Sequence, residues 1–151
     1  MAGVGILKAE YNEKEIQAII DALSKASMPK LLEIAESAGA ELDVISRKKA
    51  FESEKDPVTG KNWEELKQPN KSGKKLQGKP YHLRRTLDWE AFPDGSVIYG
   101  SNMEYARIHQ EGGQAGRGKK VTIPARPYMG VPKDFVRSVF EDPEVMDLLG
   151  L

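Results

Sequence analysis

Apolar residues recur at helical spacing twice in the first third of this chain, and this pattern constrains the fold more than any other feature of the sequence. The first stripe follows Asn12, whose side chain can cap a helix. Its members are Ile16, Ile19, Ile20 and Leu23. This spacing puts them on one helical face, and Pro29 predicts that the helix ends near Ala26.

The second stripe starts at Pro29, which suits the first turn of a helix, and keeps its rhythm to about Phe51. Its members are Leu31, Ile34, Ala35, Ala38, Leu42 and Ile45. Gly39 predicts a bend, because glycine costs a helix about 1 kcal/mol relative to alanine. The two helices must bury their stripes against each other, a sheet or another subunit. Ahead of them, the apolar residues of 4–7 predict a short strand.

The chain changes character over residues 54–82, where neither helical nor strand periodicity is present. Lys, Gly, Pro and Asn are frequent there, and Trp63 and Leu66 are the apolar anchors. A connection of this length is uncommon inside a compact domain and is usually functional or disordered. We therefore predict one long loop.

Positive charge is concentrated between Lys67 and Arg85, from the end of this loop into the next segment. The seven basic residues there are Lys67, Lys71, Lys74, Lys75, Lys79, Arg84 and Arg85. No Asp or Glu lies among them, and the whole chain has 23 basic and 23 acidic residues, so the remainder carries a formal charge of −7. Two interpretations stay open: a solvated loop, or an arm that orders against an acidic surface of a neighbouring copy or against nucleic acid.

A β-hairpin is predicted after the loop. Leu83, Leu87 and Trp89 alternate with polar residues, residues 93–95 (Pro-Asp-Gly) form a turn, and residues 96–100 return. A helix follows from Ser101 to about Gln110. Glu104 completes its capping box with Ser101, and two consecutive glycines, Gly112 and Gly113, end it.

The last third of the chain continues this mixed pattern. Residues 114–120 predict a mobile tip, and residues 121–123 predict a strand that joins the sheet of the hairpin. Pro124 and Pro127 then stiffen an extended segment. Pro132 is expected at the first position of an amphipathic helix.

A final short helix is expected after Asp142 and Pro143, which together form a cap and a first turn. The fold class is therefore α+β: a small, mostly antiparallel sheet packed with N-terminal and C-terminal helices, with one long basic loop. We predict a single domain, 1–151. Its segments are the two-helix region 1–53, the loop 54–82, the sheet and signature helix 83–130, and the C-terminal helices 131–151.

The residue types argue against catalysis or a bound cofactor. The chain has no cysteine and two histidines, His82 and His109, without metal-ligand spacing. For His109 we expect a hydrogen-bonded structural role near a helix C-terminus, where a cation is favoured. Residues 113–120 approach a phosphate-binding loop, but Lys120 stands where a hydroxyl is required. A two-carboxylate hydrolase stays open, because spacing alone cannot select a pair.

Targeting signals are not expected either. The first ten residues lack the basic region and long apolar run of a signal peptide. No stretch approaches the roughly 20 apolar residues of a membrane span.

Two segments resemble a known signature. The first reads "GSNMEYARIHQEGG" and the second "IPARPYMG". Its positions are Gly100, Ser101, Asn102, Tyr105, Ala106, Ile108, His109, Gln110, Gly112, Gly113, Ile123, Pro124, Ala125, Arg126, Pro127, Tyr128, Met129 and Gly130. Upstream, "DPVTGKNWEEL" is similar to an Asp-x-x-Gly-x-x-Trp-x-x-Leu segment of the same proteins. The resemblance, over about residues 50–140, is to the phage virion morphogenesis family.

This resemblance implies a structural, non-enzymatic role without cofactors or metals. The family's members act at the neck or tail end of the virion, at the head–tail junction, after assembly in the host cytoplasm. They are expected to form a ring, a hexamer, that contacts tail tube or head connector proteins, with DNA passing through it and no membrane involved. The alternative is a nucleic-acid-binding module that uses the basic loop Lys67–Arg85.

Overall fold

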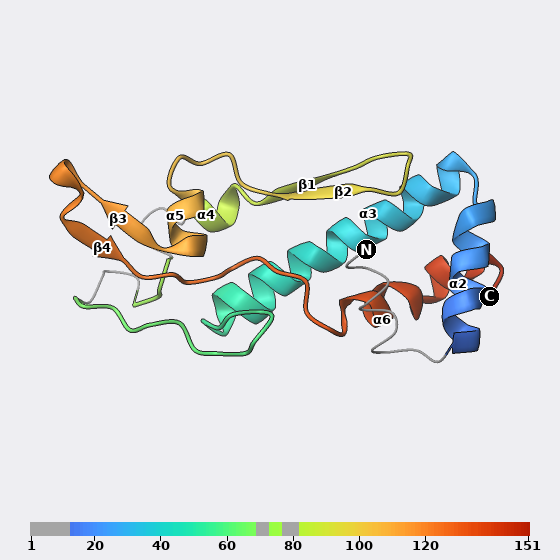
Figure 1. Ribbon diagram of the computed structural model, residues 1–151, viewed down its shortest axis with the longest axis horizontal. Coiled ribbons are helices and arrows are strands. Elements are labelled where there is room, and N and C mark those ends of the chain that lie inside the picture. Colours follow the sequence, from blue (N-terminus) through green and yellow to red (C-terminus); the bar gives the residue numbers. More distant parts are fainter. Residues whose placement is uncertain (1–12, 69–72, 77–81) are drawn as a thin grey trace. The chain divides into compact units, whose positions relative to one another are not determined.

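The computed structural model describes residues 13–68, 73–76 and 82–151 (Figure 1). The strand predicted at 4–7 and the cap at Asn12 lie outside these residues. The fold is α+β, with helices and two antiparallel two-stranded sheets in the described chain. Two compact units are present, and each takes segments from separate parts of the sequence. The single-domain assignment stays a prediction.

The first unit comprises described residues 13–41, 89–98 and 132–151. It includes helix α2 (Glu13–Lys25), most of α3 (Met28–Val44), α6 (Phe135–Phe140) and α7 (Pro143–Leu149). One hydrophobic cluster of this unit contains the buried residues Ile34, Val139 and Val145, and partly buried apolar side chains pack on them. Of the predicted stripes, Ile16 and Ile19 in α2 and Ile34 and Ala35 in α3 are buried. Ile20 does not belong to the buried face of α2, because it is 37% exposed.

Gly39 does not break α3, which is helical from Met28 to Val44. The residue is buried, and a Cβ atom at this position would overlap the indole ring of Trp89. Gly39 is therefore the position where strand β1 (Asp88–Ala91) brings a large ring against the helix. Close approach explains this glycine better than a bend does.

The predicted hairpin is present as β1 paired with β2 (Val97–Gly100). The predicted turn is confirmed, because the N–H of Phe92 donates to the carbonyl of Ser96 at 2.9 Å. Asp94 accepts from the backbone N–H of Ser96, also at 2.9 Å. Leu83, however, lies in a short helix, α4 (His82–Arg85), and not in the strand. Leu83 and Leu87 are four residues apart, a spacing that also fits one helical face, and both are buried in the second unit.

The second unit comprises described residues 42–68, 73–76, 82–88 and 99–131. Its first element, η1 (Ile45–Glu52), continues α3 as a π-helix, so the prediction of helix to about Phe51 is confirmed. Its core is aromatic: Phe51 stacks edge-on against Trp63 at 5.6 Å between ring centroids, and Tyr128 lies 5.5 Å from Phe51. The other buried members are Ala50, Leu83, Leu87 and Ala106.

Residues 121–123 do not join the hairpin sheet, which corrects the sequence-based expectation. They form β4 (Val121–Ile123), which pairs with β3 (Gly113–Ala115) in a separate antiparallel ribbon. A short 3-10 turn, η2 (Arg117–Lys119), joins the two strands. Pairing with a strand so close in sequence closes only a short loop and costs little chain entropy.

Two predicted helix starts are also shifted. The helix after Ser101 is α5 (Ala106–Glu111), and Tyr105 caps it without a side-chain bond. The Ser101 hydroxyl instead lies 2.7 Å from that of Thr86 and accepts the N–H of Met103. The capping box is therefore wrong, because the serine is used in a turn.

The first C-terminal helix begins later than predicted. Pro132 accepts the N–H of Phe135 in a turn, and α6 starts at Phe135. The last start is confirmed. Asp142 accepts the N–H of Glu144 at 2.8 Å, with Pro143 in the first turn of α7.

Candidate functional site

The signature segments meet in the second unit, and Gln110 is the residue that joins them. Its side-chain oxygen accepts the backbone N–H groups of Tyr128 and Met129, at 2.9 and 3.1 Å. Its side-chain nitrogen donates to the carbonyl of Met129 at 2.9 Å. One amide thus satisfies three backbone groups of an extended segment that has no strand partner there.

Tyr128 is the most deeply placed residue of the signature, with a relative exposure of 0%. Its hydroxyl donates to the carbonyl of Ala106 at 2.8 Å, and its own carbonyl accepts from Ser46. Burial raises the pKa of Tyr128 to about 12, so the phenol stays protonated as a donor. Ala106 is itself buried, and a small side chain there fits this close contact.

The preceding residues of the same segment hold the loop that contains Trp63. The indole N–H of Trp63 donates to the carbonyl of Pro127 at 2.7 Å. The guanidinium of Arg126, which is 7% exposed, donates to the carbonyls of Glu64 and Glu65 at 2.9 and 3.1 Å. This buried cation is therefore satisfied by carbonyl oxygens.

Gly112 allows helix α5 to end directly against the same segment. Its φ is 75°, and its N–H donates to the carbonyl of Ile108 at 2.7 Å. A Cβ atom at Gly112 would lie 2.8 Å from the backbone nitrogen of Ala125. Glycine is thus required by conformation and by space. The predicted stop of the helix at this glycine is confirmed.

His109 is hydrogen-bonded through its backbone, whereas its ring lacks, within the described residues, the partner that a hydrogen-bonded structural role would supply. Its backbone carbonyl accepts from Arg126, but its buried Nδ1 has no hydrogen-bond partner among the described residues. The ring faces Tyr105 edge-on, 5.7 Å between centroids. Burial, and then the positive charge of Arg126, lower the pKa of His109. The neutral imidazole is therefore favoured, and the expected stabilisation of a cation at the helix end is outweighed by desolvation.

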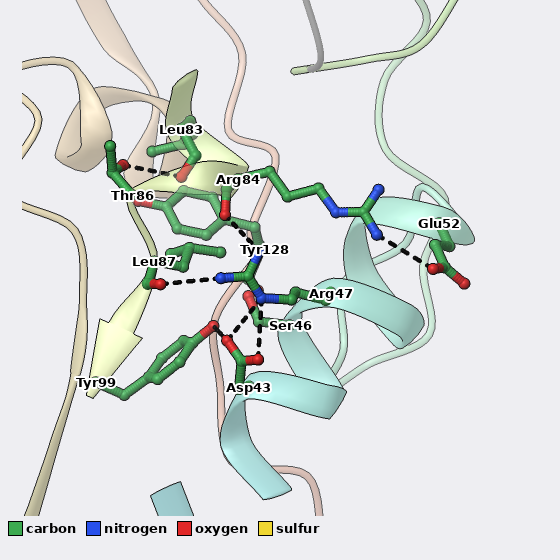
Figure 2. Close-up of polar contacts among 10 residues, drawn as sticks. All are labelled: Asp43, Ser46, Arg47, Glu52, Leu83, Arg84, Thr86, Leu87, Tyr99 and Tyr128. Carbon is green, nitrogen blue, oxygen red and sulfur yellow. Dashed lines mark hydrogen bonds and ion pairs between the residues drawn. The ribbon is translucent and has the colours of Figure 1, made fainter. Parts of the chain in front are cut away.

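A second polar network in this unit carries no sequence signature (Figure 2). Arg47 donates through Nε to the Asp43 carboxylate at 2.8 Å and through its terminal nitrogens to the carbonyls of Arg84 and Leu87, at 2.8 and 2.9 Å. Tyr99 donates to the same carboxylate at 3.0 Å. Desolvation raises the pKa of Tyr99. The (i, i+4) spacing of Asp43 and Arg47 is the one part visible in the sequence.

The remaining signature residues serve the same scaffold or lie at its surface. A Cβ at Gly130 would meet the side chain of Val58, and Gly100 lies near the sulfur of Met129. Asn102 is exposed. The half-buried positions are Tyr105, Ile108, Ile123 and Pro124.

The basic loop divides into residues of different kinds. Lys75 is 9% exposed, and its ammonium lies 2.8 Å from Glu65 and donates to the carbonyl of Trp63 at 3.2 Å. It is held within its own chain and is not presented to a partner. Arg84 pairs with Glu52 at 3.1 Å. The other described members, Lys67, Lys74 and Arg85, are exposed, and Lys71 and Lys79 lie outside the described residues.

No group of three or more His, Cys, Asp or Glu side chains among the described residues could hold a metal ion. Residues 113–120 form strand β3 and the turn before β4, not the strand-to-helix turn of a phosphate-binding loop. None of the described helices has the length and apolar character needed to cross a membrane.

These contacts give the signature side chains a structural role, because they bind backbone groups of their own chain and fix three segments together. The chain belongs to the phage virion morphogenesis family, whose sequence model matches residues 11–144. No solved structure matches it. Family membership and the names of its relatives point to a role in building the virion rather than to catalysis.

Two relatives are similar in sequence. "Mu-like prophage FluMu G protein 2" of Haemophilus influenzae is 45% identical over 51 residues, which are 34% of this chain and 37% of that protein. The chain therefore spans little more than a third of that relative. "Putative capsid assembly protein G" of Escherichia phage Mu is 29% identical over 137 residues, 85% of each chain.

Proposed function

We propose that this protein completes the tail or neck of a phage particle at the head–tail junction by forming a ring of identical subunits, with six as the expected number. The observation that supports this best is the use of the signature. Its side chains make hydrogen bonds within the chain, as those of Gln110, Arg126 and Tyr128 do. Because these side chains are used within the chain, recognition of a partner is left to the exposed charged side chains.

A ring also fits the uneven charge of the chain. Ring subunits make heterologous contacts, in which one surface meets a different surface of the next copy. Opposite charges on the two surfaces steer such an encounter and fix its orientation. Each contact should bury on the order of 1,200–2,000 Å². The further partners of the ring are tail tube or head connector proteins, and DNA would pass through it.

The experiment is native mass spectrometry and negative-stain electron microscopy of the purified protein, alone and with tails that lack it. We expect a closed oligomer of one size, and its binding at one end of the tail. A strictly monomeric protein that also fails to bind tails would contradict the proposal.

The loop lysines other than Lys75 can be tested separately. Lys67→Glu with Lys71→Glu and Lys74→Glu should weaken ring assembly at moderate salt without changing the melting temperature. Lys75 must be left intact, because its ammonium is bound inside the chain. An unchanged oligomer mass would remove the loop from the contact.

A nucleic-acid-binding module has less support. Among the described basic residues between Lys67 and Arg85, Lys75 and Arg84 pair with acidic side chains of their own chain. Strong affinity for DNA that falls steeply with salt would favour it nonetheless.

A further inference from the structure

The tip of the β3–β4 ribbon is a basic surface that its own chain leaves unused. Arg117, Lys119 and Lys120 are all exposed, and none forms an ion pair with any described residue. Val121, next to them, is 54% exposed. A two-stranded ribbon is only marginally stable alone, and this one projects three cations and an apolar side chain from its turn.

An acidic groove of about 360 Å³ lies in the first unit between α3 and α7. It is lined by Glu33, Glu36, Ser37, Glu144, Asp147 and Leu148. Its four carboxylate side chains are exposed, and within the described chain none of them has a cationic partner. Like charges this close repel one another unless a cation or a basic partner compensates them.

The two surfaces have opposite charges, and each contains one apolar side chain. The groove offers four carboxylates around Leu148, and the tip offers three cations beside Val121. A contact between two different surfaces of identical subunits is the heterologous type that generates rings.

We propose that the ribbon tip of one copy docks in the groove between α3 and α7 of the next copy. This inference rests on the proposed ring and names the surfaces that make it. The occupant of the groove is a second copy of this chain, and the contact is electrostatic at its rim with Val121 against Leu148 at its centre.

Charge reversal tests the pairing. The tip variant carries Arg117→Glu, Lys119→Glu and Lys120→Glu, and the groove variant carries Glu33→Lys, Glu36→Lys and Asp147→Lys. Each alone should lose most of the oligomer, and both sets combined in one chain should restore it, because the contact is rebuilt with opposite signs. The matched control reverses three exposed lysines elsewhere: Lys48, Lys61 and Lys133. It makes the same change in net charge as the tip variant and should assemble like the wild type.

The outcomes separate the two proposals. A wild-type ring that survives both single variants overturns the docking and leaves the ring. Failure of the combined variant to reassemble, while it melts like the wild type, also overturns the docking. A wild type that never assembles refutes both. Loss of DNA binding in the tip variant, with the oligomer intact, would assign the tip to nucleic acid instead.

Crosslinking gives a readout that does not depend on charge reversal. The chain has no cysteine, so Lys119→Cys with Glu36→Cys introduces a unique pair. Mild oxidation should give a ladder of covalent oligomers that stops at the number of subunits in the ring. Each single variant should give dimers at most. A crosslink confined to the monomer, or no ladder from an assembled ring, would overturn the proposal.

Discussion

Replacement of Gln110 by alanine should destabilise the second unit more than an ordinary surface change. Its side chain makes three hydrogen bonds to the backbone of Tyr128 and Met129. At about 1 kcal/mol for each bond, the loss is about 3 kcal/mol. For a chain of this length, that corresponds to a fall in melting temperature of roughly 6–12 °C.

The assay is thermal unfolding followed by circular dichroism, with two companion variants. Gln110→Glu keeps the acceptor for both N–H groups but places a carboxylate oxygen against the Met129 carbonyl, so we expect an intermediate loss. Gln114→Ala is the control, since the exposed side chain of Gln114 accepts one hydrogen bond, from Thr122, among the described residues. Equal melting temperatures for Gln110→Ala and Gln114→Ala would refute the reasoning.

Three further predictions concern single side chains. Gly39→Ala should destabilise the first unit by about 1–2 kcal/mol in urea unfolding. The overlap of the new methyl group with Trp89 should outweigh the gain of about 1 kcal/mol in helix propensity. A stabilised variant would contradict this. The folded pKa of His109 lies below its ordinary 6.5, so the unfolded chain takes up the proton first. The free energy of unfolding should therefore fall as pH drops below about 6.5, and less so in His109→Gln; equal slopes would contradict it. Lys75→Met should lower the free energy of unfolding by about 1–2 kcal/mol in the same urea titration, because it removes the donor to a buried carbonyl. Lys67→Met, at an exposed position, should change this free energy by less than about 0.5 kcal/mol.

The helices and turns that the sequence predicted correctly depend on local physics. Apolar periodicity predicted α2 and α3, and turn and cap residues predicted the start of α7 and the bend at Asp94. The sequence-based predictions were wrong where one residue pattern is compatible with two secondary structures. The spacing of Leu83 and Leu87 fits a helix as well as the end of a strand, and tertiary burial decided between them.

The residues of the candidate site were identified by resemblance, but their hydrogen-bond partners could not be predicted. Gln110 and Arg126 bind backbone carbonyls and N–H groups. Almost every residue carries these backbone groups, so the sequence does not indicate which residue will be the partner. The carbonyl partners of Arg47 were hidden for the same reason.

The two tryptophans of the chain are distributed one to each unit. Trp89 lies over Gly39 in the first, and Trp63 is buried in the aromatic core of the second. Substitution of either indole by phenylalanine would leave a single tryptophan, whose emission reports on the unit that contains it. Coincident fluorescence transitions of the two variants in denaturant would show that the units unfold as one cooperative body, and separated transitions would show independent folding.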